Sequence, residues 1–293
     1  MAYSNPIDCS WHREGMGARN CICFVGDIHG VRDRMAAIVS EAARRGARTI
    51  IQVGDFGIWP EMRHSRPQTD GFDSDVAAML ERHGVDQLVF VDGNHDWHPW
   101  LRFQQRKHAA RLAEGRAADA GGQLVERTVP IEESGRVRWA PRGTVIELAG
   151  LRILMCGGAP SIDRELRVQG QSWWPEEAIT DEDVARSCAV GPVDVLVTHD
   201  ASELVAIPGI VDHWAPGEAS RHRVERIRSA TRPRWAFSGH YHKRLSALVG
   251  DDQSQTCWEM LGCENNTLEE HMVVVDAETS RQVQESGGLR SVA

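Results

Sequence analysis

Seven side chains that commonly bind divalent cations lie in five short segments of this sequence. They are two aspartates, one asparagine and four histidines: Asp27, His29, Asp55, Asn94, His199, His240 and His242. Carboxylate, amide and imidazole groups together suit borderline and hard cations such as manganese, iron and zinc. Seven ligands are too many for one tetrahedral site, and they suit two metals that share a bridging carboxylate. We therefore expect two divalent metal ions, with manganese as the first choice and iron or zinc as alternatives.

Each of these segments comes at the end of a predicted strand. The strands are short apolar runs at 21–25, 49–53, 87–91, 193–198 and 235–238. Amphipathic helical patterns at 31–45 and 74–83 separate the first three runs, which is typical of βαβ units and a parallel sheet. Because the carboxyl ends of parallel strands line one crevice, ligands that are far apart in the sequence can converge there.

A different pattern follows in the middle of the chain. Apolar runs at 137–140, 144–148 and 151–156 are closely spaced, and Ala149-Gly150 fits a tight hairpin turn. This spacing predicts antiparallel pairing and a second sheet. We expect a mixed α/β chain with an N-terminal arm (1–20), a single domain (21–279) and a loose polar tail (280–293).

Composition excludes several classes of protein. The 293 residues are 41% hydrophobic and 26% charged, as in ordinary globular proteins. No apolar run reaches the roughly 18 residues of a membrane span, and no secretory signal is evident, so we expect a cytoplasmic protein with no membrane partner. The net charge of −9 gives no strong sign of general nucleic-acid binding. A nucleotide substrate stays open, because bound metals would reverse the local potential.

The five segments also carry a recognisable family pattern. They read Gly26-Asp27-Ile28-His29-Gly30, Gly54-Asp55, Gly93-Asn94-His95-Asp96, Thr198-His199-Asp200 and Gly239-His240-Tyr241-His242. In order and spacing, these motifs resemble those of the calcineurin-like metallophosphoesterase superfamily. The resemblance extends from about Cys21 to Asp276, which is most of the chain.

The resemblance implies a fold and a role for each motif. The fold would be a two-sheet β-sandwich flanked by helices, with the metal site at strand carboxyl ends. One metal would be bound by Asp27, His29 and His242, the other by Asn94, His199 and His240, and Asp55 would bridge them. A metal-activated water would attack phosphorus, and His95 would protonate the leaving oxygen or stabilise the transition state.

One motif departs from the protein-phosphatase branch of the superfamily. That branch continues its second motif with an Asp that orients the catalytic His and then an Arg, whereas this chain has Ile58 and Trp59. The difference weakens assignment as a protein Ser/Thr phosphatase. We consider Asp96 as the residue that orients His95 instead.

Substrate contacts are expected from a Gly-containing segment in the middle of the chain. Arg164 and Arg167 could bind phosphate there, and Trp173 and Trp174 could stack on a base. The alternative is that these tryptophans pack in the core and the arginines pair with surface acids.

Hydrolysis of a phosphomonoester is the expected reaction. The substrate would be a phosphorylated molecule: a nucleotide, a small-molecule phosphate or a protein phosphate. Two alternatives stay open: a phosphodiesterase or nuclease of the same family, and a scaffold that has lost activity. The scaffold is disfavoured because all seven ligand positions and His95 are present.

Overall fold

The computed structural model describes residues 21–59, 71–114, 127–210, 215–251 and 254–277. The predicted arm (1–20) and tail (280–293) lie outside the described residues. The single domain predicted for 21–279 stays a prediction.

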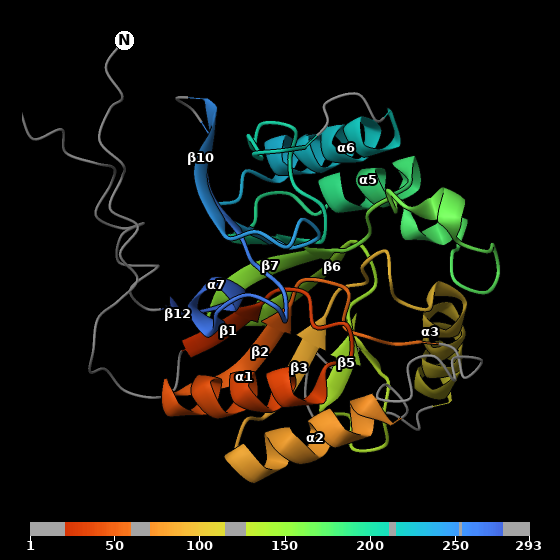
Figure 1. Cartoon of the computed structure of the whole chain (residues 1–293), viewed down its shortest axis with the longest axis vertical. Helices are drawn as coiled ribbons and strands as arrows, with labels where there is room; N and C mark the ends of the chain where they lie inside the picture. The colour runs from red at the N-terminus through yellow and green to blue at the C-terminus, as the bar shows by residue number, and fades with distance from the viewer. Residues whose placement is uncertain (1–20, 60–70, 115–126, 211–214, 252–253, 278–293) are drawn as a thin grey trace, which may run out of the picture.

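The first sheet contains six strands in the order β12-β1-β2-β3-β5-β4. Its four inner strands run parallel to one another: β1 (Cys21–Val25), β2 (Ala47–Gln52), β3 (Gln87–Phe90) and β5 (Val137–Trp139). The edge strands, β12 (Met272–Asp276) and β4 (Val129–Pro130), are antiparallel to their neighbours. Three helices pack on this half of the molecule (Figure 1): α1 (Arg32–Arg44), α2 (Phe72–His83) and α3 (His98–Ala113).

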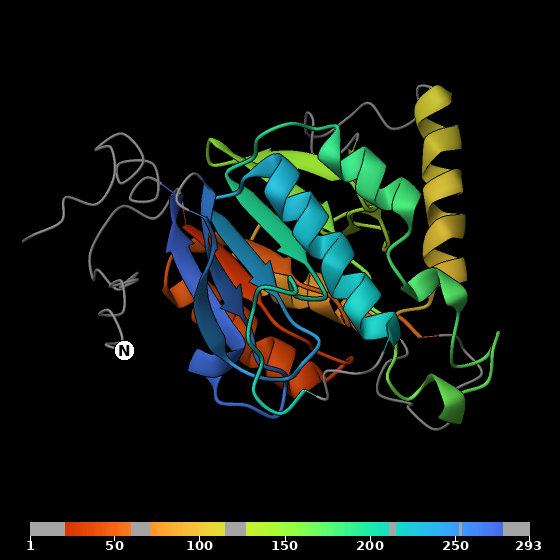
Figure 2. The same ribbon diagram turned by 90° about the horizontal axis from the view of Figure 1, so that it is seen from above.

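The second sheet repeats this plan with the order β10-β11-β9-β8-β7-β6. Its parallel strands are β11 (Ser254–Met260), β9 (Trp235–Ser238), β8 (Val195–Thr198) and β7 (Leu151–Cys156). The antiparallel edges are β10 (Leu245–Asp251) and β6 (Thr144–Leu148). The helices α5 (Asp181–Cys188) and α6 (Ala215–Thr231) cover its outer face, as Figure 2 shows from above.

The two sheets pack face to face, which gives helix, sheet, sheet and helix layers. Side chains of a strand alternate between its two faces. On β1, Cys23 and Val25 pack towards the helices, whereas Ile22 and Phe24 belong to the core between the sheets. Phe24 stacks on Phe237 of the second sheet with 3.7 Å between ring centroids. Burial on both faces explains why the parallel strands read as continuous apolar runs.

The predicted sandwich flanked by helices is therefore confirmed, with one correction. The run at 137–140 was expected to belong to the second sheet, but β5 pairs in parallel with β3 in the first sheet. Only β6 and β7 form the predicted antiparallel hairpin. The chain crosses between the sheets at 140–143, a short connection that hydrophobic pattern alone does not reveal. Two further elements, β4 and the short helix α7 (Leu268–His271), are not indicated by the sequence pattern.

No helix in the described part of the chain is long and apolar enough to cross a membrane. The six described cysteines have free thiols, and all of them lie in the residues expected to form the domain: Cys21, Cys23, Cys156, Cys188, Cys257 and Cys263. The cytoplasmic location stays a prediction.

Candidate metal centre

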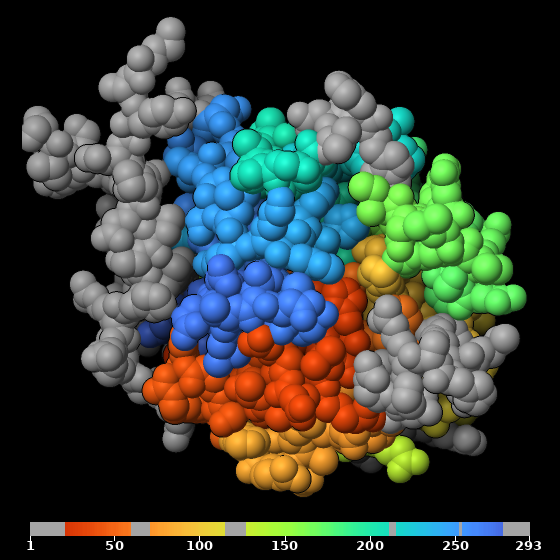
Figure 3. Space-filling view, in the orientation of Figure 1, coloured from red at the N-terminus to blue at the C-terminus, as the bar shows by residue number. Residues whose placement is uncertain are grey.

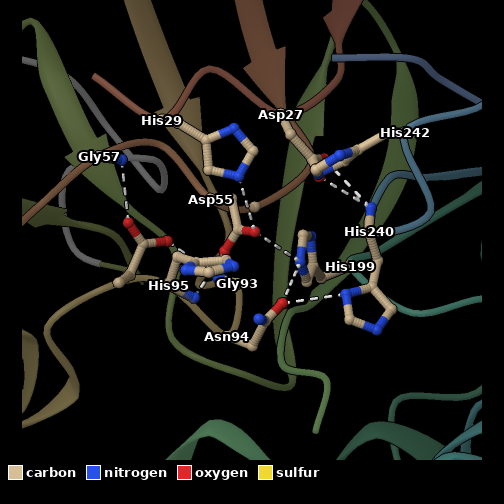
Figure 4. A network of polar contacts seen from close by, with 12 residues as sticks. Asp27, His29, Asp55, Gly57, Gly93, Asn94, His95, His199, His240 and His242 are labelled. Carbon is tan, nitrogen blue, oxygen red and sulfur yellow. Dashed lines mark hydrogen bonds and ion pairs between the residues drawn. The ribbon is translucent and has the colours of Figure 1, made fainter. Parts of the chain in front are cut away.

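The seven predicted ligands meet where the carboxyl ends of strands from both sheets come together. The first sheet supplies Asp27 and His29 after β1, Asp55 after β2 and Asn94 after β3. The second sheet supplies three histidines, His199 after β8 and His240 and His242 after β9. Figure 4 shows these side chains pointing toward one another. The convergence that the parallel strands predict is therefore present.

One group of ligand atoms gathers around Asp27. Ligand atoms of Asp27, His29 and His242 all lie within 4.8 Å of one another. The Nε2 of His242 is 3.2 Å from Asp27 Oδ2. Asp27 is fully buried, and its carboxylate also accepts the backbone N–H of His240 at 3.1 Å. These three side chains are the ones expected to bind the first metal.

A second group gathers around the amide oxygen of Asn94. That Oδ1 lies 3.1 Å from His199 Nε2 and 2.9 Å from His240 Nδ1. Asp55 stands between the two groups, because its Oδ2 is 3.3 Å from His29 Nε2 and 3.4 Å from His199 Nε2. This position is the one that a bridging carboxylate would occupy.

Contacts behind the ligands fix which imidazole nitrogen faces the centre. The Nδ1 of His29 is 2.8 Å from Glu264 Oε2, and the Nδ1 of His199 is 2.9 Å from the carbonyl of Val53. Each Nδ1 therefore donates to an acceptor outside the centre, so Nε2 is the nitrogen that faces the centre, and a bound cation would take the place of its proton. Sequence reasoning missed Glu264, which lies in a loop after β11 without any motif.

The carboxylates of the centre favour the binding of cations. Burial raises the pKa of Asp55, but the neighbouring His199 and His95 outweigh it and hold the pKa well below the usual range. Burial lowers the pKa of His29, yet hydrogen bonds to Asp55 and Glu264 raise it well above normal. Asp55 thus stabilises positive charge on His29 and His199. Divalent cations would supply that charge directly, so the donor set fits metal binding.

The backbone around the ligands is under steric constraint. Positive φ angles occur at His29 (49°), Asp55 (57°), His240 (71°) and His242 (54°). Such conformations in non-glycine residues concentrate at functional sites, where surrounding structure holds them. A Cβ on Gly93 would lie 2.1 Å from Asp55 Oδ1. Glycine is therefore required beside this ligand.

His95 lies beside Asp55, Arg167 and Trp59. The backbone N–H of His95 donates to Asp55 Oδ1 at 2.7 Å, and burial, with a smaller contribution from Arg167, lowers the pKa of its imidazole to about 4. The ring centroid of His95 is 5.8 Å from that of Trp59.

Asp96 was expected to orient His95, but its hydrogen bonds in the described residues go elsewhere. Its carboxylate accepts four backbone N–H groups, those of Gly93, Gly57, Ile58 and Phe56, at 2.9, 3.1, 3.2 and 3.4 Å. Asp96 thus joins the loop that carries Asp55 to the loop that carries Asn94. Ile58 donates its backbone N–H to this carboxylate, and so it takes part through its main chain.

The four predicted substrate residues are distributed unequally around the centre. Arg167 brings its Nη2 to 3.0 Å from His95 Nε2, while it also pairs with Asp163 at 2.8 Å. Arg164 is exposed on the short helix η2 (Arg164–Leu166). Trp173 is half-buried, whereas Trp174 is buried with 5% exposure. The green segment that carries these residues stands out at the right of Figure 3.

Comparisons with known proteins identify a family and structures of similar fold. The family model for calcineurin-like phosphoesterases matches residues 22–244. No curated protein matches. Among solved structures, TT1561 of Thermus thermophilus is similar with a TM-score of 0.50 and 12% identity, over 88% of this chain and 99% of that one. A dimetal phosphatase from Danio rerio has a TM-score of 0.49 and 13% identity, over 87% of this chain and 91% of that one.

The match to the family model covers most of the chain and includes every motif of the centre. Members of this family use divalent metals, and candidate ligand groups for them are present here. The chain belongs to the calcineurin-like phosphoesterases, and it is a metal-dependent hydrolase of phosphoric esters.

Proposed function

We propose that this chain is a manganese-dependent phosphomonoesterase with two cations. Asp27, His29 and His242 would hold one cation, Asn94, His199 and His240 the other, and Asp55 would bridge them. The single observation that carries the monoester assignment is the guanidinium of Arg167, 3.0 Å from His95 Nε2.

The argument rests on charge. A phosphomonoester has a second pKa near 6 and therefore carries close to two negative charges at neutral pH, whereas a diester carries one. Arg167 adds a fixed positive charge with planar, two-pronged donors beside the cluster. Its side chain is only 9% exposed, so solvent screens that charge weakly. Asp163, which is more exposed and lies 2.8 Å away, balances part of this charge, and the remainder favours the more highly charged ester.

Each of these side chains would have a distinct role in the proposed hydrolysis. Bound cations would lower the pKa of a water and neutralise charge on the phosphoryl oxygens. Arg167 donates to His95 Nε2 in the substrate-free site. Phosphate oxygens are stronger acceptors than imidazole, so substrate would draw the guanidinium away from His95 Nε2. That nitrogen accepts from Arg167 and carries no proton in the substrate-free site, so it would take up a proton from solvent and then donate it to the leaving oxygen. Asp96 would hold the loop of His95 against the loop of Asp55, because its carboxylate accepts four backbone N–H groups from these two loops.

A nucleotide remains one candidate substrate. The half-buried Trp173 is the tryptophan that a base could reach, because Trp174 is enclosed by protein. Arg164 lies one helical turn from Arg167 and is available to an extended phosphate.

The experiment compares an aryl phosphate monoester with the matching diester, using chelator-treated protein resupplied with Mn²⁺, Fe²⁺ or Zn²⁺. We expect faster turnover of the monoester, with Mn²⁺ the most effective metal and no turnover in chelator. Faster turnover of the diester would make the chain a phosphodiesterase. Metal binding without turnover of either ester in a broad phosphate panel would support a scaffold.

A further inference from the structure

A buried chain of hydrogen bonds leads from the metal ligand Asn94 into the segment that carries Arg167. The Nδ2 of Asn94 donates to Ser161 Oγ at 3.1 Å. Ser161 Oγ in turn donates to Glu177 Oε2 at 2.7 Å, and its backbone N–H donates to Glu177 Oε1 at 2.6 Å. The three residues are at most 4% exposed, so water does not compete for these bonds.

The direction of this chain is fixed by the number of protons available. A serine hydroxyl has one proton, and an ionised carboxylate can only accept. Burial raises the pKa of Glu177, but the hydrogen bonds from the Ser161 N–H and hydroxyl oppose that rise and favour the ionised form. Ser161 therefore gives its proton to Glu177 and must accept from Asn94. Only the Nδ2 side of the amide can donate, so Oδ1 has to face the opposite way, toward His199 and His240.

We infer that Ser161 and Glu177 are positioning residues that orient the Asn94 amide so that its oxygen, and not its nitrogen, faces the metal. An amide nitrogen has no lone pair available for a cation, so the reversed amide would remove one ligand. The inference rests on the proposed role of Asn94 as a ligand. It assigns to Ser161 and Glu177 a function that no motif of the sequence indicates.

The same contacts join the metal centre to the substrate segment. Ser161 and Glu177 stand on either side of Arg167 in the sequence; Ser161 is held directly by Asn94, and Glu177 is held through Ser161. The segment begins against the same strand end, because the backbone N–H of Gly158 donates to the carbonyl of Asp92 at 2.6 Å. A Cβ on Gly157 would lie 2.3 Å from that carbonyl oxygen, which explains the close approach. Orientation of Asn94 and placement of Arg167 thus depend on one set of anchors.

The test is a stepwise calorimetric titration of Mn²⁺ into chelator-treated full-length protein, without substrate. In Ser161→Ala we expect the affinity of one of the two Mn²⁺ steps to fall about 10–100-fold, with the other step unchanged. In Glu177→Gln one carboxylate oxygen is replaced by an NH2 group, which donates. This group either donates to Ser161 Oγ, which reverses the direction of the hydrogen bonds, or faces the Ser161 N–H, which is also a donor. In both cases the same Mn²⁺ step should weaken. Ser172→Ala is the matched control, since Ser172 is exposed on this segment and, among the residues that the structure describes, its Oγ accepts only the N–H of Val168.

The outcomes separate the inference from the proposed function. Unchanged Mn²⁺ steps in Ser161→Ala and Glu177→Gln would overturn the inference, and so would equal weakening of both steps with a lower unfolding temperature. If Ser161→Ala does not fold, Glu177→Gln, which conserves volume, decides. Binding of fewer than two Mn²⁺ by the wild type would contradict the proposed two-metal site and the inference with it. Preference for a diester would contradict only the proposed monoesterase.

Discussion

The metal cluster and the neighbouring segment 157–177 are positioned in different ways. Every ligand of the cluster lies within a few residues of the end of a regular strand. The segment has no strand of its own and contains two short 3-10 helices, η2 and η3 (Pro175–Glu177). Side chains from elsewhere in the fold hold it, notably Arg142 and Asn94. We therefore expect substitutions of the metal ligands to abolish hydrolysis, whereas substitutions of the anchoring side chains should displace the segment that is proposed to bind substrate.

The largest loss of activity is expected from the proposed bridge between the metals. Asp55→Asn keeps the shape of the side chain, and its remaining oxygen can still accept the His95 N–H, but it removes the charge between the two ligand groups. We expect kcat to fall by about 10³-fold or more, because several kcal/mol of charge stabilisation depend on the cations. Steady-state kinetics with the aryl monoester measures the loss.

Thermal unfolding of the metal-free protein is the control for Asp55→Asn, and the variant should remain folded. Full activity in this variant would contradict the two-metal mechanism.

Breaking the anchor of the segment should give the largest loss of stability. The guanidinium of Arg142 is 1% exposed and contacts Asp92 at 2.6 Å and Asp183 at 3.2 Å. Although burial raises the pKa of Asp92, Arg142 lowers it to about 2, so the carboxylate stays ionised. Arg142→Met leaves that buried charge without its guanidinium partner, with only Trp139 Nε1 at 3.2 Å and His98 Nδ1 at 3.6 Å still beside it among the described residues. We expect the free energy of unfolding to fall by about 3–5 kcal/mol.

Chemical denaturation measures this loss, and Arg186→Met provides the control. Arg186 pairs with the same Asp183 at 2.5 Å, but its side chain is 55% exposed. Exposed ion pairs contribute about 0–1 kcal/mol, so the control should change little. Equal losses in both variants would show that Arg142 does not anchor the segment in a special way.

The sequence predicted the cluster better than the segment for a physical reason. An apolar run that ends in glycine and a ligand is a local pattern, and parallel strands bring their ends together without further information. Contacts such as Asn94 to Ser161 and His29 to Glu264 join residues 67 and 235 positions apart. Nothing in the local pattern of Ser161 or Glu264 marks it as a partner. The same holds for β4, whose two residues are strand only because β5 lies beside them.

A smaller, selective loss is expected from Arg167→Gln. Charge-assisted hydrogen bonds contribute about 1.5–3 kcal/mol, so kcat/KM for the aryl monoester should fall about 10–100-fold. The loss with the matching diester should be smaller, because the diester carries less charge. The same measurement on Arg164→Gln compares the two predicted phosphate-binding arginines. Equal losses in the two variants would show that contact with His95 does not distinguish Arg167.

The smallest effect is expected behind the metal cluster, at Glu264. The Glu264→Gln side chain can still accept the proton of His29 Nδ1, but it no longer carries the charge that helps to raise the pKa of this imidazole. Loss of such an outer carboxylate weakens metal affinity at the low end of the usual range, about 10-fold. Mn²⁺ titration should show this loss at the step that Ser161→Ala leaves unchanged, because His29 and Asn94 belong to different ligand groups. Glu269→Gln makes the same charge change at an exposed position nearby and should bind Mn²⁺ like the wild type. If both Glu264→Gln and Ser161→Ala weakened the same step, the division of the seven ligands between two metals would have to be redrawn.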